Sequence, residues 1–166
     1  MSMNALPANS RLWLLALQAA PAPAAEARLR QGLGEILTQW RHKGQAYQGV
    51  GMLLEPQLIA VAEPSLASHP SGCAIDGMLR KIQRLLEQLD LALVDPGASI
   101  LVRLGDQLAC IAKTDIQARL EDGTLDGATP VLDLSLYSLA DLREGRLEAP
   151  LAGTWVGRKH RVAVDV

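Results

Sequence analysis

The sequence contains no phenylalanine, only two cysteines and three histidines, and aromatic residues make up 3% of the chain. Two cysteines cannot form a disulfide framework, and three scattered histidines cannot form a zinc finger. No apolar run approaches the roughly 18 residues of a membrane span, so we expect no membrane partner. The 16 basic and 18 acidic residues leave a formal net charge of −2, which gives no strong attraction to nucleic acid.

The chain also lacks the motifs that bind nucleotides. It has no G-x-x-x-x-G-K-[ST] sequence, and Gly32 and Gly34 fall inside an expected helix rather than after a strand. We therefore expect no ATPase activity, no dinucleotide site and no cofactor. The sequence leans away from an enzyme but leaves that question open.

The composition is that of a folded protein, because 49% of the 166 residues are hydrophobic and this length suits a single domain. Residues 12–17 form an apolar run behind a single basic residue, Arg11, which is too short for the core of a secretory signal. We expect this run to be a first strand, followed by a linker rich in alanine and proline, in a cytoplasmic protein. Self-association is left open.

The apolar periodicity predicts an ordered series of helices and strands. Leu29, Leu33, Ile36 and Trp40 mark a helix over 25–40, with Gly44 as its stop, and residues 75–89 form a second amphipathic helix. Apolar runs at 46–54 and 58–62 predict one hairpin, and runs at 99–104 and 107–112 predict another around a Gly-Asp turn. This order predicts an α+β fold with a ferredoxin-like split βαβ core, β-α-β-β-α-β plus one added strand, over residues 1–113.

Residues 114–166 are expected to form a small α/β extension packed on that core, within a single domain. Two short stretches, 118–126 and 140–148, resemble each other, and each is expected to contain a short helix stopped by a glycine, Gly123 or Gly145. Asp115, with Thr114, and Ser138 are the expected N-caps, and residues 129–134 are expected to be extended.

Reactive side chains gather only in residues 68–77, immediately before the second helix. If Ser71 is the N-cap, Gly72 and Cys73 occupy the first turn, where free backbone N–H groups favour an anion. Ser71, Gly72 and Cys73 are therefore candidate residues for an anion or small-ligand site.

The same segment permits two other interpretations. A cysteine in the first turn of a helix can become a thiolate nucleophile, with His69 as its base and Asp76 as a nearby carboxylate. Alternatively, the segment is only structural, with Ser71 as a cap and Cys73 as a small buried group. His69, Cys73 and Asp76 do not have the spacing of a zinc site, so no metal is expected. The leading hypothesis is a binding or interaction module of unknown function, and the alternative is a cysteine-dependent enzyme.

Two further features favour structural roles. Cys110 falls on an alternating strand and is expected to be a buried thiol. Residues 158–161, Arg-Lys-His-Arg, form a short basic cluster that we interpret as a solvated tail rather than a nucleic-acid site.

The stretch Ser71-Gly72-Cys73-Ala74-Ile75-Asp76 resembles the S-G-C-[SA]-I-D segment of a family of small bacterial proteins of unknown function. Some members carry the label ATP-binding-cassette transporter ATPase. Trp13 in the first strand, Trp40 near the end of the first helix and Trp155 near the C-terminus are similar to that family too. The resemblance implies a shared fold and a shared cysteine segment, while the transporter label would require a Walker sequence that this chain lacks.

Overall fold

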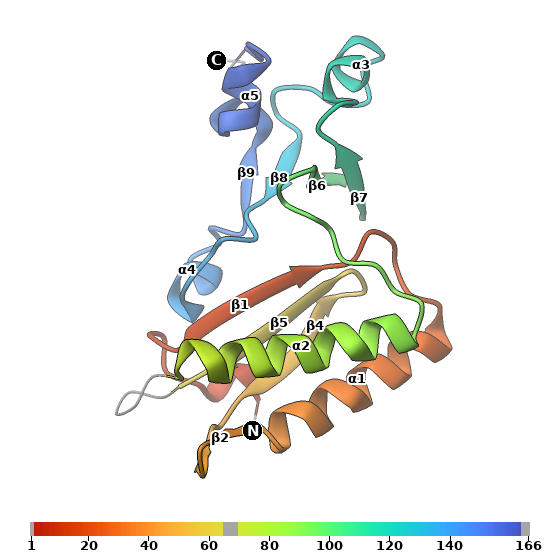
Figure 1. Ribbon diagram of the computed structural model, residues 1–166. Helices are drawn as coiled ribbons and strands as arrows, with labels where there is room; N and C mark the ends of the chain where they lie inside the picture. The colour runs from red at the N-terminus through yellow and green to blue at the C-terminus, as the bar shows by residue number, and fades with distance from the viewer. Residues whose placement is uncertain (1, 65–69, 164–166) are drawn as a thin grey trace.

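The computed structural model describes residues 2–64 and 70–163, which form two lobes, each built on its own antiparallel sheet (Figure 1). The first lobe contains a three-stranded sheet with strand order β1-β5-β4. Its strands are β1 (Arg11–Ala16), β4 (Val50–Glu55) and β5 (Leu58–Glu63). The central strand β5 is buried along its whole length, as its nearly uninterrupted apolar sequence predicts.

Two helices, α1 (Pro23–Thr38) and α2 (Gly72–Gln88), cover one face of this sheet (Figure 1). Both expected helices are confirmed. Met78, Ile82 and Leu86 of α2 are buried against the sheet and α1, while Leu85 is half-buried. The side chains at these spacings lie on one face because an α-helix repeats every 3.6 residues.

The opposite face of the sheet is covered by η1 (Met3–Ala5) and α4 (Leu139–Arg143). Leu12 and Leu14 of β1 point into this second apolar cluster, whereas Trp13 points toward the helices. One guanidinium nitrogen of Arg143 donates to the carbonyl oxygens of the N-terminal segment, at 3.1, 3.1 and 2.9 Å from the oxygens of residues 3, 4 and 6. The sheet of the first lobe is therefore covered on both faces.

A short hairpin after α1 is absent from the sequence prediction. It consists of β2 (Arg41–His42) and β3 (Gln45–Ala46). Lys43 and Gly44 both have positive φ, 48° and 81°, which is the geometry of a type I′ turn. The expectation that Gly44 ends the first helix is wrong, because the helix ends at Thr38 and the glycine forms this turn.

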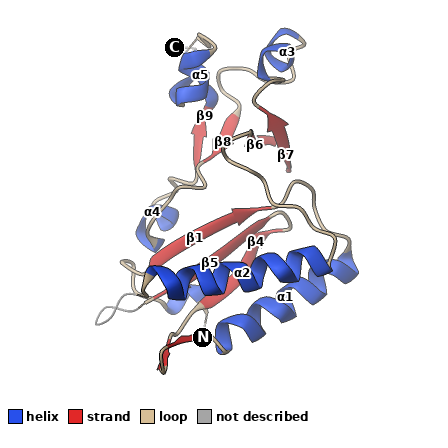
Figure 2. Cartoon of the chain, viewed as in Figure 1, coloured by secondary structure: helices blue, strands red, loops and turns tan. Residues whose placement is uncertain are grey.

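The second lobe contains a four-stranded antiparallel sheet with strand order β7-β6-β8-β9. Its strands are β6 (Ser99–Leu104), β7 (Gln107–Ala112), β8 (Pro130–Leu132) and β9 (Glu148–Pro150). The sheet packs with α3 (Ile116–Glu121), η2 (Leu151–Gly153) and α5 (Trp155–Lys159) around a separate apolar cluster. Figure 2 shows the two sheets as separate groups of strands. The β6-β7 hairpin confirms its expected bounds, and Gly105 takes the positive φ of 60° that its two-residue turn requires.

The fourth strand of the expected ferredoxin-like sheet is not residues 99–104, because that strand, β6, lies in the second sheet. Near the end of β1, residues 92–94 make a short contact instead: Gln18 N donates to Ala92 O at 2.9 Å, and Val94 N donates to Ala16 O at 2.8 Å. The following Asp95-Pro96-Gly97 turn leads the chain away, since proline has no N–H to continue a ladder. The complete ferredoxin-like topology is therefore not confirmed. Strands from both sides of the expected boundary at residue 113 share the second sheet.

Several local expectations for the C-terminal part are confirmed. Ser138 caps α4 by accepting a hydrogen bond from Asp141 N at 3.2 Å, and Gly123 and Gly145 have φ values of 76° and 75°. Asp115 occupies the N-cap position of α3 as expected, but its side chain makes no capping hydrogen bond. The prediction missed β9 and α5, and α5 contains part of the basic cluster. Within the described ranges, no helix has the length and apolar composition needed to cross a bilayer.

A small apolar cluster joins the two lobes. The first lobe contributes Ala16, Leu58 and Val94 to it, and the second contributes Leu101, Leu108 and Leu132. Because these side chains are buried, the two sheets are held against each other rather than connected by an open linker.

Candidate functional site

The segment singled out in the sequence begins α2 as expected. Ser71 is the N-cap, and its Oγ accepts a hydrogen bond from Ala74 N at 3.3 Å. Trp40 Nε1 donates to Ala74 O at 2.9 Å in a buried contact, which fixes the first turn of α2 against the core. The start of this helix is therefore held in place by a cap and by an aromatic side chain.

The candidate reactive residues of this segment lie at the surface. Cys73 and Asp76 are both exposed, so the expectation that Cys73 is a small buried group is wrong. The first turn directs Ala74 and Ile75 toward the core and position 73 toward solvent. His69, the expected base, lies outside the described residues. Cys110 is partly buried and packs beside the cluster that joins the lobes.

Among the described residues, no group of three or more His, Cys, Asp and Glu side chains could hold a metal ion.

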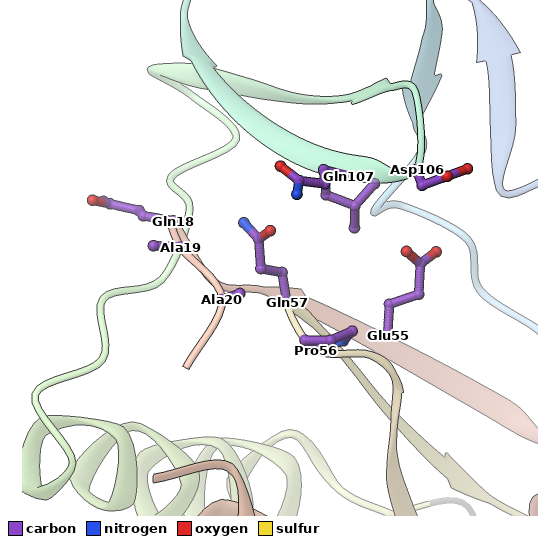
Figure 3. Close-up of a pocket in the computed structure, with 9 residues that line it drawn as sticks. Gln18, Ala19, Ala20, Glu55, Pro56, Gln57, Asp106 and Gln107 are labelled. Carbon is purple, nitrogen blue, oxygen red and sulfur yellow. The ribbon is translucent and has the colours of Figure 1, made fainter. Parts of the chain in front are cut away.

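The structure shows a cavity that the sequence does not reveal. It is half open to solvent and has a volume of about 470 Å³ at the junction of the two lobes, which is in the range of small-molecule sites. Two hairpin turns face each other across it (Figure 3): the β4-β5 turn below and the β6-β7 turn above. The cavity is lined by residues 18–20, 55–57 and 106–108.

Gln57 is the least exposed residue that lines this cavity, with 7% of its surface accessible to solvent. Its Nε2 donates to Leu17 O at 3.2 Å, and a carbonyl oxygen can only accept, so this contact fixes which end of the amide is nitrogen. Its Oε1 has no hydrogen-bond partner among the described residues. Figure 3 shows the Gln57 side chain pointing toward Gln107 of the opposite turn, so the amide oxygen is an acceptor that a ligand could use.

Of the two carboxylates that line the cavity, that of Glu55 is paired with an arginine and that of Asp106 is paired with no described residue. Arg103 Nη1 and Nη2 donate to the two carboxylate oxygens of Glu55 at 3.1 and 2.6 Å, and Arg103 also pairs with Glu148. These hydrogen bonds to Glu55 and then to Glu148 raise the pKa of Arg103 well above its usual value. Asp106, in contrast, has no ion-pair partner among the described residues. The carboxylate of Asp106 is therefore the uncompensated negative charge of the cavity lining.

Sequence reasoning treats Glu55, Gln57 and Asp106 only as parts of turns. The available signal is the occurrence of polar side chains in two hairpin turns, and it does not show that turns about 50 residues apart face each other. That juxtaposition depends on the packing of the two lobes.

Comparison of the chain with models of protein families, with curated proteins and with solved structures found no match in any of the three. The resemblance of residues 71–76 to the S-G-C-[SA]-I-D family therefore stays a prediction.

Proposed function

We propose that this chain is a small binding module whose ligand occupies the cavity between the two hairpin turns. The observation that carries the proposal is the nearly buried Gln57, whose amide nitrogen is bound to Leu17 O and whose amide oxygen is left for a partner. Oε1 of Gln57 is not one of the fully buried side-chain atoms without a partner among the described residues, so it can be reached from the cavity, and a ligand that donates a hydrogen bond to it gains affinity.

The lining also defines the chemical class of the ligand. Gln57 Oε1 and the carboxylate of Asp106 are acceptors, and Asp106 carries a charge that no described residue neutralises. An ammonium group or a primary amide supplies N–H donors, and the ammonium adds charge complementarity. The ligand is accordingly a small amine or amide, and a carboxylate of the same size is repelled.

Three probes with the same carbon skeleton test this assignment: butylammonium, butyramide and butyrate. Each is titrated into the ¹⁵N-labelled protein at constant ionic strength, and the backbone amide signals of Gln57 and Gln107 are followed by NMR. We expect saturable shifts with butylammonium and butyramide and none with butyrate. Equal binding of butyrate, or no saturable binding of any probe, would show that the proposal is wrong.

Asp106→Asn tests the charge without changing the size of the side chain. It should weaken butylammonium binding about five- to tenfold, equivalent to roughly 1 to 1.4 kcal/mol, and leave butyramide binding unchanged. Asp115→Asn is the matched control, because Asp115 precedes α3 and does not line the cavity. An equal effect of both substitutions on butylammonium would argue against a local role for Asp106.

A cysteine-dependent enzyme remains the alternative proposal, with Cys73 as nucleophile, His69 as base and Asp76 nearby. The exposure of Cys73 favours it, since a nucleophile must be accessible. If the segment binds a ligand instead of carrying out catalysis, we propose that the first turn of α2, formed by Ser71, Gly72 and Cys73, holds an anion or another small ligand.

We also infer that the first lobe is related to ferredoxin-like domains. The antiparallel order β1-β5-β4 is the order of the first three strands of such a sheet. The short antiparallel bridge between Leu17 and Leu93 lies beside β1, where the fourth strand would be.

A further inference from the structure

A second cavity lies within the second lobe, separate from the junction. It is half open to solvent, has a volume of about 530 Å³ and is lined mainly by apolar side chains of β6, β8 and the segment before α5. Strands β6 and β8 pair only at Val102 and Val131. The cavity follows the unpaired continuation of both strands, along residues 99–101 and 132–135. The end of the strand pairing thus explains why a hollow exists here.

Trp155 lines this cavity and is 53% exposed, although it is one of the largest apolar side chains of the chain. Its backbone is fixed, because Thr154 Oγ1 donates to Leu151 O at 2.7 Å and accepts from Gly157 N at 3.1 Å. An indole ring held at the edge of an apolar hollow is a surface on which a flat apolar group can pack.

Two cations lie against the indole ring. Lys113 Nζ is 4.9 Å from the centre of the Trp155 ring and Lys159 Nζ is 5.9 Å from it. Neither lysine has an ion-pair partner among the described residues. Lys113 Nζ donates to Pro96 O at 2.6 Å and to Gly97 O at 3.1 Å. Since an ammonium has three donors, one donor of Lys113 remains for a ligand.

The lining also contains one carboxylate, that of Asp133. Its Oδ1 accepts hydrogen bonds from Ser135 N at 2.8 Å and from Ser135 Oγ at 2.5 Å, so it is held by its own turn. Asp133 is negatively charged and Lys113 is positively charged. A ligand held by Asp133 instead of Lys113 would therefore be a cation. The two alternatives therefore differ in the sign of the ligand's charge.

From this arrangement we propose that the second-lobe cavity binds a small apolar carboxylate. Its apolar body packs on Trp155 and the side chains of β6 and β8, and its carboxylate accepts a hydrogen bond from Lys113. The charge complementarity comes from Lys113 and is reinforced by Lys159 on the same ring. This site is independent of the amine or amide site between the lobes, because the two cavities share no lining residue.

The test uses phenylacetate, phenylacetamide and phenethylammonium as probes of similar shape. The full chain is ¹⁵N-labelled, and the indole N–H signal of Trp155 is identified by its loss in Trp155→Phe. We expect phenylacetate to shift this signal saturably, with an affinity at least fivefold higher than that of the other two probes. Equal affinities for phenylacetate and phenylacetamide, tighter binding of phenethylammonium, or no saturable shift would overturn the proposal.

Variants of Lys113 locate the charge effect. Lys113→Gln should lower the affinity for phenylacetate about fivefold or more and leave phenylacetamide binding unchanged. Lys113→Arg keeps the positive charge and should therefore retain phenylacetate binding. Lys81→Gln is the control, because Lys81 is an exposed lysine of α2 that does not line the cavity. Unchanged phenylacetate affinity in a folded Lys113→Gln variant would overturn the assignment. If this variant does not fold, the three-probe comparison on the unaltered chain still decides.

A peptide with a free C-terminus carries the same chemical group. Acetyl-Leu-Phe with a free carboxylate is therefore titrated beside phenylacetate. A similar or weaker affinity for the peptide supports a small free acid as the ligand. Binding of the peptide more than tenfold tighter than that of phenylacetate would overturn the small-acid proposal in favour of a chain terminus.

Discussion

Cys73 and Cys110 differ in exposure although the sequence favours burial for both. Cys73 lies on the outer side of the first turn of α2, and Cys110 lies partly buried where the lobes meet. Alternation along β7 predicts a buried Cys110, and the structure bears this out only in part, because residues 109–112 of β7 are all partly exposed. The first turn of a helix is more ambiguous, since a rotation of one position moves a side chain from the core to the solvent.

Iodoacetamide should therefore modify Cys73 about tenfold or more faster than Cys110 in the folded protein at neutral pH, because reaction requires access to the sulfur. Mass spectrometry measures the rate at each cysteine. The same reaction in denaturant gives the rates without structure and should remove the difference between the two sites.

The comparison of folded and unfolded protein also separates the two functional hypotheses. For a binding module, we expect Cys73 to react no faster in the folded protein than in denaturant, and Cys73→Ser to bind butylammonium as the unaltered chain does. Faster reaction in the folded protein would instead support the thiol enzyme, since only the fold can activate the sulfur.

Among the elements, α2 is the one whose amphipathic pattern best predicts its packing. The stripe that contains Ile82 and Leu85 faces the sheet and α1, and the structure distinguishes these two neighbours. Ile82 is fully buried, whereas Leu85 is half-buried at the margin of the stripe. The helical period gives the face of the helix, and the position of α1 decides how far around the helix the burial extends.

Replacing Ile82 by alanine should lower the free energy of unfolding by about 2–5 kcal/mol, because it leaves a cavity in a packed core. Leu85→Ala should lower it by less than about 2 kcal/mol, since less apolar surface is lost from the interior. Urea denaturation of both variants measures the two values. Similar losses for the two variants would show that the two positions are equally buried in solution.

For the whole molecule, the junction between the lobes decides where the proposed ligand site lies. Besides the apolar cluster, Arg103 connects β6 with Glu55 of the first lobe and with Glu148 of the second. The three side chains are each about one-quarter to one-third exposed, so solvent weakens this network without removing it.

Arg103→Met should lower the free energy of unfolding by about 1–3 kcal/mol, because it leaves two carboxylates near each other without their common cation. Arg30→Met is the matched control, since Arg30 pairs with Glu26 on the exposed side of α1, and it should change stability by no more than about 0.5 kcal/mol. Adding Glu55→Gln to Arg103→Met should recover part of the loss. Equal effects of Arg103→Met and Arg30→Met in urea denaturation would mean that the network does not hold the lobes together.

The sequence alone determined most helices and strands of this protein and several of its turns. Apolar periodicity, the Gly105-Asp106 turn and the stops at Gly123 and Gly145 are local signals, since each depends on residues a few positions apart. The short hairpin at 41–46 and strand β9 were not predicted from the sequence, because strands of two or three residues show no hydrophobic periodicity.

Only the tertiary structure decided which sheet β6 joins, and therefore that the molecule has two lobes. Pairing of an apolar strand is non-local: the sequence of β6 is compatible with a place beside β1 or beside β8, and the packing of the whole chain selects one. Both proposed ligand sites depend on that choice. Gln57 faces Gln107 because the lobes meet at their hairpin turns, and Trp155 lines a hollow because β6 and β8 separate after one pair.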